Sequence, residues 1–408
     1  MKKIINFIED QEKKLEDTFK EIQKVEFYNQ KKILEAMQEE RLASTDFHWT
    51  TGYGYGDVGR DKLEAIYARV FATEDALVRP NIVSGTHAIS LALKSLAQVG
   101  TTILSITGPP YDTLQKVLGI QGEEKTSLSA KGIAYREVPL LEGGAINYEA
   151  LKNPQLYENV SLVILQRSTG YSNRRAFTIQ ELERAIKQVK SMTSVPVFVD
   201  NCYGEFTETL EPSQIGADVL AGSLIKNPGG GLAYTGGYLV GKEDLIQWIA
   251  SELTAPGIGK ECGLTFGQTR TNLQGLFLAP QTVANCLKGM LLFSTCFEEL
   301  GYTCVPSSQD PRSDIVQAIA LKDKDKLLSF CRAIQATSPV DSHVTPYPWD
   351  MPGYEDPVIM AAGGFIEGSS IELSADGPLR APYWVYLQGS LTYSHCKLAL
   401  IKILEDFM

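Results

Sequence analysis

Strand-like and helix-like segments alternate along residues 60–250 of this 408-residue chain, and this alternation constrains its fold more than any other feature. Short apolar runs such as SLVILQ, VPVFVD and ADVLAGS predict buried strands. The segments between them have helical periodicity, and one opens with a capping box formed by Thr178 and Glu181. Strands that alternate with helices form a mostly parallel sheet with helices on both faces. We therefore expect an α/β fold.

The remaining segments lie on either side of this sheet-forming region. Residues 1–58 predict a charged helical arm followed by a glycine-rich loop, residues 59–285 the α/β domain, and residues 286–408 a smaller α+β domain. Two or three domains suit a chain of this length. The arm has too little apolar surface for a core of its own. We expect it to lie on another part of the protein or on another subunit.

Charge and composition exclude several classes of partner. The chain has 38 Lys and Arg against 49 Asp and Glu, a net charge of −11, so no basic face for nucleic acid or an anionic membrane is expected. It contains no run of 18 apolar residues and starts without the apolar stretch of a signal peptide, which favours a cytoplasmic protein. Seven cysteines without a C-x-x-C pair suggest reduced structural thiols, and four scattered histidines predict no metal site.

Ligands of such sheets bind outside the carboxyl ends of the strands. In NIVSGTHAISLALKSL an apolar run ends at Ser84, and an amphipathic helix follows. The free N–H groups at Gly85 and Thr86 could bind a phosphate group, because a helix N-terminus favours anions. Alternatively, Ser84 is simply the N-cap of the helix.

Two more strand ends carry charged side chains. Asp200 ends VPVFVD, where it either caps the next loop or faces a cationic ligand. Lys226 follows ADVLAGSLI and precedes three glycines, Gly229–Gly231. Apolar surroundings would lower the pKa of this lysine and make it a nucleophile or a base, although it could also be an ordinary loop lysine.

Together these features meet the needs of one cofactor, pyridoxal 5′-phosphate. Its aldehyde requires a lysine amine, such as Lys226, for a Schiff base. A carboxylate, such as Asp200, favours the protonated ring nitrogen. Its phosphate group suits the helix N-terminus. Tyr111, in GPPYDTLQ, either stacks on the cofactor ring or packs in the core.

The same motifs resemble those of the fold-type I pyridoxal phosphate enzymes, and among them the γ-family of cystathionine and methionine lyases. VDNCYGEF is similar to the family segment V-D-N-T-[FY], GSLIK to S-x-T-K and SGTHA to S-G-M-A. QRSTGYSNR, GSLIKNPGGG and ELSADGPLRAPY resemble the bacterial branch described as methionine γ-lyase-related or aluminium-resistance proteins. The resemblance implies the fold-type I fold and these roles: Lys226 as Schiff-base lysine, Asp200 at the pyridine nitrogen, Ser223, Gly85 and Thr86 at the phosphate group, and Tyr111 on the ring.

A glycine-rich stretch, GYGYGDVGRDKLE, fits G-x-G-x-x-G, but no strand precedes it, so a dinucleotide site is not expected. DVGRDKLE resembles the family's N-P-T-x-x-x-L-E, which follows a Tyr-x-Arg that reaches the neighbouring subunit's phosphate group. The resemblance thus implies a homodimer with shared active sites, and a homotetramer. Tyr55 or Tyr53 would supply the tyrosine, and the arginine is absent. Packing of a glycine-rich turn is the alternative.

Two further departures concern the site itself. Ile225 replaces the family's threonine before the lysine, and Glu372 stands where the substrate-carboxylate arginine is expected. Arg380 is our substitute candidate, because a planar guanidinium suits an α-carboxylate.

The function that these residues imply is a pyridoxal phosphate-dependent carbon–sulfur lyase. It would act on a small sulfur amino acid and release thiol, 2-oxo acid and ammonia. Lys226 would serve as base and Tyr111 as acid for the leaving sulfur. Transamination, retro-aldol cleavage, thiol addition, or non-catalytic cofactor binding in aluminium tolerance are the alternatives.

Overall fold

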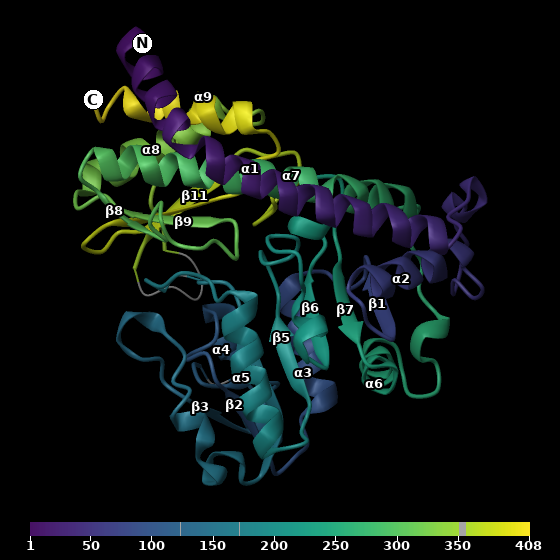
Figure 1. Ribbon diagram of the computed structural model, residues 1–408. Coiled ribbons are helices and arrows are strands. Elements are labelled where there is room, and N and C mark those ends of the chain that lie inside the picture. Colours follow the sequence, from purple (N-terminus) through teal and green to yellow (C-terminus); the bar gives the residue numbers. More distant parts are fainter. Residues whose placement is uncertain (123, 171, 351–355) are drawn as a thin grey trace.

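Two β-sheets, joined by one long helix, form the protein (Figure 1). The computed structural model describes residues 1–122, 124–170, 172–350 and 356–408. The larger sheet has seven strands in the order β1-β7-β6-β5-β4-β2-β3. These strands are β1 (Asp75–Arg79), β2 (Thr102–Ser105), β3 (Ala134–Glu137), β4 (Val160–Gln166), β5 (Val197–Asp200), β6 (Val219–Ser223) and β7 (Gly237–Gly241).

The larger sheet is mostly parallel, as predicted. Strands β2 to β6 pair in parallel, whereas β7 runs antiparallel to both β1 and β6. The predicted strands and the capping box at Thr178 are confirmed. The sequence analysis did not find β1, whose five residues begin and end with charged side chains.

Helices cover both faces of this sheet. One face carries α3 (Gly85–Leu96), α4 (Asp112–Leu118) and α6 (Glu243–Leu253). The other carries α2 (Val58–Val70), α5 (Ile179–Met192) and part of α7 (Thr269–Glu299). Strands β4 and β6 between these layers are almost completely buried, which explains why they appear in the sequence as continuous apolar runs, whereas the edge strand β3 is mostly exposed.

The smaller sheet is antiparallel, with the order β10-β11-β12-β9-β8. Its strands are β8 (Thr303–Val305), β9 (Val316–Ala320), β10 (Val358–Ala362), β11 (Ser374–Pro378) and β12 (Trp384–Gln388), and it packs with α8 (Lys324–Thr337) and α9 (Tyr393–Leu404). The arm is one helix, α1 (Lys2–Glu39), which lies along α7 of its own chain. Figure 1 shows both chain ends beside α9.

Helix α7 belongs to both domains. Its first half packs in the core of the larger sheet, and its second half, from Met290, packs in the core of the smaller one. The domain boundary predicted at residue 285 therefore falls inside this helix. By length and composition alone α7 could cross a membrane, but 72% of its apolar window is buried within the protein, as expected of a core helix.

The loop after β6 touches α7 through glycines. A Cβ atom on Gly275 of α7 would collide with the carbonyl oxygen of Gly229, and one on Gly230, whose φ is +54°, would collide with the carbonyl oxygen of Gly275. These contacts are backbone against backbone, so no side chain can move aside. The glycines thus allow the lysine-bearing loop to lie directly on the helix that connects the two domains.

Replacing Gly275 with alanine is expected to destabilise the protein by about 2 kcal/mol or more, because α7 and the loop must separate. Urea unfolding measures this change. The matched control is Gln274→Ala, one residue earlier on an exposed position of α7, which should change stability by less than about 0.5 kcal/mol. Equal stabilities of the two variants would contradict the close approach.

Candidate active site

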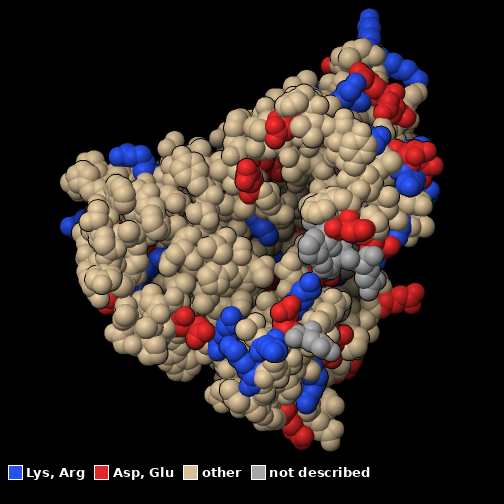
Figure 2. Space-filling view, turned by 180° about the vertical axis from the view of Figure 1, so that it is seen from behind, with Lys and Arg blue, Asp and Glu red and all other residues tan. Residues whose placement is uncertain are grey.

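A cavity of about 600 Å³ lies at the carboxyl ends of β5 and β6, between the two sheets. The space-filling view in Figure 2 shows a hollow in this protein's surface with charged side chains around it. From the larger domain the cavity is lined by Ser84, Gly85, Thr86, Tyr111, Asp200, Cys202, Tyr203, Ser223 and Lys226. The smaller domain adds Met360, Gly368, Asp376, Tyr386 and Gln388. Six predicted site residues, Lys226 among them, therefore share one cavity.

Lys226 follows β6 by three residues and lies against an aromatic ring. Its Nζ is 3.8 Å from the centroid of the Tyr203 ring, a cation–π contact. Burial lowers the pKa of Lys226, but Cys202, Tyr203, Asp200 and Glu205 around it raise the pKa above its ordinary value. The prediction of a lowered pKa is therefore wrong. The apolar sequence context gave no sign of the carboxyl groups that surround the amine.

Asp200 ends β5, directly beside β6. Its backbone pairs with Ala221, two residues before Ser223, and its Oδ1 accepts a hydrogen bond of 3.1 Å from the Cys202 N–H. Burial raises the pKa of Asp200, while Lys226 opposes that shift. The aspartate therefore does both things considered from the sequence: it caps the turn that follows, and it lies in the lysine cavity.

The N-terminus of α3 forms another wall of the cavity. The Ser84 side chain accepts a 3.1 Å hydrogen bond from the His87 N–H, so Ser84 is an N-cap. The N–H groups of Gly85 and Thr86 belong to the first helical turn, which has no intrahelical acceptors for them. A Cβ atom on Gly85 would lie 3.2 Å from Cys202 Sγ and 3.3 Å from Ser223 Cβ, which is tight. The absent side chain allows α3 to approach β6 closely.

Tyr111 and Arg380 lie around a second cavity of about 320 Å³. Tyr111, Gln166 and Gly170 line both cavities, and the Tyr111 N–H donates a 2.8 Å hydrogen bond to Gln166 Oε1. Arg380 lines only the second cavity, where it pairs with Asp356 at 3.5 Å. Its side chain is 55% exposed. Arg380 is thus next to the lysine cavity and not inside it.

Tyr55 does not line the cavity of its own chain. It lies in an exposed loop, 60% accessible, with its ring 5.9 Å from that of Tyr53. The glycines of this loop have a packing role: a Cβ atom on Gly54 would lie 2.8 Å from the Gly263 carbonyl oxygen, and Arg60 Nη1 donates to the Gly54 carbonyl oxygen at 2.7 Å. Packing therefore accounts for Gly54, and both tyrosine rings point outward.

Sequence reasoning missed Tyr203. Its φ of +69° is in the left-handed region, which costs a non-glycine residue about 1 kcal/mol or more. Asn227 Nδ2 stabilises this turn by donating 2.9 Å hydrogen bonds to the carbonyl oxygens of Tyr203 and Glu205. The available signal was its place in VDNCYGEF, three residues after Asp200 and at the aromatic position of the family segment V-D-N-T-[FY].

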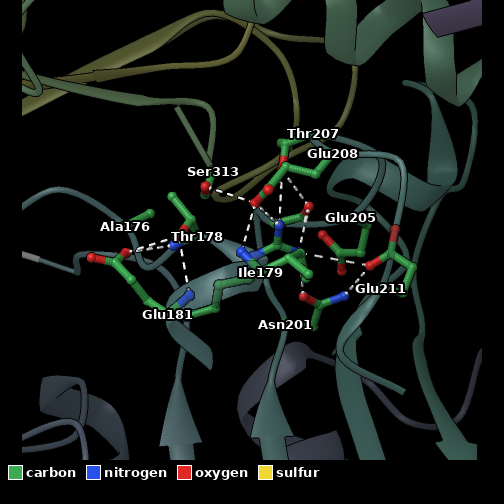
Figure 3. A network of polar contacts seen from close by, with 12 residues as sticks. Ala176, Thr178, Ile179, Glu181, Asn201, Glu205, Thr207, Glu208, Glu211 and Ser313 are labelled. Carbon is green, nitrogen blue, oxygen red and sulfur yellow. Dashed lines mark hydrogen bonds and ion pairs between the residues drawn. The ribbon is translucent and has the colours of Figure 1, made fainter. Parts of the chain in front are cut away.

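Arg167, which directly follows β4, has a structural role. It is fully buried, and its guanidinium donates to Asn201, Gly204, Thr207 and Glu208 at 2.9–3.2 Å (Figure 3). Glu208 also accepts from the Ile179 N–H and Ser313. This network holds the turn after β5 behind the cavity.

Comparison with known proteins assigns the chain to a family. Residues 4–408 match the model of the methionine gamma-lyase family. The chain belongs to this family. It is also 49% identical to the uncharacterized protein YnbB of Bacillus subtilis (strain 168), over 95% of this chain and 93% of that protein.

Solved structures agree with this membership. A carbon-sulfur lyase involved in aluminum resistance from Clostridium novyi NT is 47% identical, covers 100% of this chain and 96% of its own, and superposes with a TM-score of 0.96. Two distant structures share the fold alone. The first is the pyridoxal-5′-phosphate dependent protein YhfS from Escherichia coli, with 17% identity, coverage of 95% of this chain and 97% of that chain, and a TM-score of 0.63. The second is apo CalE6, a methionine gamma lyase from Micromonospora echinospora, with 15% identity, coverage of 84% of this chain and 86% of that chain, and a TM-score of 0.55. The fold-type I architecture is therefore confirmed.

The donor set of the cavity fits pyridoxal phosphate. An amine and a carboxyl group face the same space, and a helix N-terminus with a close-packed glycine lies at its wall. Among the departures from the family pattern, Ile225 lines the cavity and offers no hydroxyl group. Glu372 does not face the cavity. It is 6% exposed and accepts 2.8 Å hydrogen bonds from the N–H groups of Phe365 and Ile366.

Glu372 therefore holds the loop that carries Gly368 into the cavity. Its replacement by alanine should leave two part-buried N–H donors without their acceptor and destabilise the protein by about 1 kcal/mol or more. Glu372→Gln keeps one acceptor oxygen and should lose less. Urea unfolding, together with proteolysis within residues 363–371, measures both variants. A Glu372→Ala protein as stable and protease-resistant as the wild type would contradict this role.

Proposed function

We propose that this protein is a pyridoxal phosphate-dependent carbon–sulfur lyase that acts on a sulfur amino acid. The observation that carries the proposal is the single cavity shared by Lys226, Asp200, Tyr111 and the N-terminus of α3. When bound, the cofactor supplies an aldehyde for the substrate amine and a ring that accepts electrons from Cα. The residues of the chain supply binding, orientation and proton transfer.

Lys226 and Asp200 have complementary roles in this proposal. Lys226 binds the cofactor aldehyde, and its amine, once displaced by the substrate, removes the proton at Cα as general base. Because its neighbours raise the pKa of Lys226, this amine must give up a proton before it can bind the aldehyde. Asp200, as a carboxylate, holds a proton on the ring nitrogen of the cofactor.

Different residues would hold the phosphate group and the substrate. The N–H groups of Gly85 and Thr86 and the hydroxyl of Ser223 bind the phosphate group. Tyr111 stacks on the cofactor ring and protonates the leaving sulfur. Arg380 binds the substrate carboxylate, for which it must exchange its ion pair with Asp356, because the guanidinium lies beside the lysine cavity.

The test compares the wild type with Lys226→Ala and Arg380→Ala. The wild type should show visible absorbance from bound cofactor that borohydride removes, and should release ammonia and a 2-oxo acid from cystathionine, cysteine or methionine. Lys226→Ala should lose both properties. Arg380→Ala, the matched control, should keep the absorbance and raise KM about tenfold or more. A Lys226→Ala protein with wild-type absorbance and turnover would exclude the assignment.

The amino-acid panel also separates the alternative reactions. Oxo acid released only when a second oxo acid is supplied would indicate a transaminase. Bound cofactor whose spectrum no amino acid changes would indicate a non-catalytic protein. Release of pyruvate distinguishes β-elimination from γ-elimination, which gives 2-oxobutyrate.

We further propose that the protein is a homodimer with shared sites, assembled into a homotetramer. Figure 2 shows a broad area of one face without charged side chains. The Gly263 N–H donates a 2.9 Å hydrogen bond to the carbonyl oxygen of Tyr53 and so links the loops that contain these two residues. Val83 and Tyr234 line the cavity and have large exposed side chains, and Trp49, Tyr53, Tyr55, Val58 and Phe266 are exposed elsewhere.

Co-expression of two inactive chains tests the shared site. If Tyr55 acts in the partner subunit's cavity, Tyr55→Ala and Lys226→Ala chains should restore activity when they assemble together, because each mixed dimer then has one complete site. Random pairing gives about a quarter of the wild-type activity. Light scattering should give a mass four times that of the chain. Absence of any restoration in a confirmed mixed dimer would place Tyr55 outside the partner's site.

A further inference from the structure

The turn after β5 contains a buried carboxyl group that the proposed reaction does not use. Glu205 is fully buried, and its Oε1 accepts a 2.6 Å hydrogen bond from the Tyr238 hydroxyl. A Cβ atom on Gly222 of β6 would lie 2.6 Å from this oxygen. The carboxyl group thus lies against the backbone of β6 next to Ser223, on the sheet face opposite α3, where glycine makes room for it.

The same turn holds the aromatic ring that contacts the lysine. Tyr203 and Phe206 both have positive φ, +69° and +63°, so the turn between them is strained and needs anchors. One anchor is the pair of hydrogen bonds from Asn227 to the Tyr203 and Glu205 carbonyl oxygens. The Glu205 side chain is the second anchor, because it ties the turn to β7 through Tyr238.

We propose that Glu205 is a positioning residue of this site: as a neutral carboxylic acid it anchors the turn that holds the Tyr203 ring against the Lys226 amine. In the described residues no Lys, Arg or His forms an ion pair with Glu205, and its Oε2 is buried without a hydrogen-bond partner. An ionised carboxylate in that position would be uncompensated, which is costly. The neutral acid avoids this cost.

The charged and titratable groups around Glu205 agree with a neutral acid. Tyr238 faces it from β7, Tyr67 from α2, and Lys226 and Cys202 from the cavity side. Glu211 lies beside it (Figure 3). Two of the nearby cations, Arg167 at 3.7 Å and Lys32 of α1, face Glu211. Lys226 forms no ion pair with Glu205 but lowers its pKa, which only partly offsets the effect of burial. Burial raises the pKa of Glu205 to about 8, and Glu211 adds to this shift.

Ionisation of Glu205 above that pH has two consequences. It weakens the anchor of the Tyr203 turn, because a buried carboxylate is less stable than a hydrated one and favours a conformation that exposes it to solvent. It also places a negative charge near Lys226, which favours the ammonium form, and an ammonium ion cannot condense with an aldehyde. We therefore expect alkaline pH to loosen cofactor retention through Glu205.

Linkage gives the sign of the effect on stability. An unfolded glutamate titrates near pH 4, so between about pH 5 and pH 8 the folded protein holds a proton that the unfolded chain lacks. The contribution of Glu205 to stability therefore falls as the pH rises across this interval. The equilibrium constant for unfolding increases by up to about tenfold per pH unit. Above about pH 8, where Glu205 is ionised in the folded protein as well, this contribution no longer changes with pH.

The experiment compares urea unfolding of the holoprotein and of Glu205→Gln at pH 6, 7, 8 and 9. The amide has nearly the same shape and no proton to lose. The free energy of unfolding of Glu205→Gln, relative to that of the wild type, should rise from pH 6 to pH 8 and then remain constant. Glu252→Gln, on an exposed position of α6, is the matched control and should show a pH-independent difference. A pH-independent difference for Glu205→Gln as well would overturn the proposal.

A second variant keeps the test decisive if Glu205→Gln does not fold. The Tyr238 hydrogen bond favours the ionised form of Glu205 and so lowers its pKa. In Tyr238→Phe, the pH at which stability stops falling should therefore be higher than in the wild type. If stability stops falling at the same pH in Tyr238→Phe as in the wild type, the role of Glu205 is refuted. Cofactor retention after gel filtration at pH 7 and pH 9 gives the functional readout: the wild type should lose more cofactor at pH 9 than Glu205→Gln, and equal losses would count against positioning of Lys226.

This inference rests on the proposed function only in that Lys226 binds the cofactor. The unfolding measurements involve no turnover, so a protein that binds pyridoxal phosphate and cleaves no carbon–sulfur bond can still confirm the role of Glu205. Conversely, a proven lyase with a pH-independent Glu205→Gln difference would reject only this inference.

Discussion

The adjacent parallel pairing of β5 and β6 is the constraint on which the site depends. Because the two strands end at the same edge of the sheet, Asp200 and the loop that carries Lys226 are brought to one cavity. A carboxyl group and an amine at that edge influence each other through a buried environment, where electrostatic interactions are strong. The chemistry proposed for the protein uses this pair.

The surroundings of the pair keep it in place from two sides. Below the lysine loop, Gly229 and Gly230 lie against α7, which also forms part of the core of the smaller domain. Opposite, the loop held by Glu372 brings Gly368 to the cavity wall. The cavity between the sheets therefore depends on both domains and on the helix they share.

Periodicity and short motifs predicted the sheet, its helices and six residues of the shared cavity, because each of these depends on local sequence or on strand order. They could not predict the direction of the pKa shift of Lys226, which depends on the side chains of Cys202, Tyr203, Asp200 and Glu205 around it. Nor could they predict the Tyr203 contact, which requires a left-handed turn at a non-glycine residue. Arg380 illustrates a similar limit. The sequence indicated a side chain suited to bind a carboxylate, but it could not show that this side chain pairs with Asp356.

The most direct test of the central claim is to identify the atom to which the cofactor is attached. Holoprotein reduced with borohydride and digested should yield one peptide with a pyridoxyl phosphate group, and fragmentation should place it on the Nζ of Lys226. A label on any other lysine, or a protein that binds the cofactor yet gives no labelled peptide, would contradict the account.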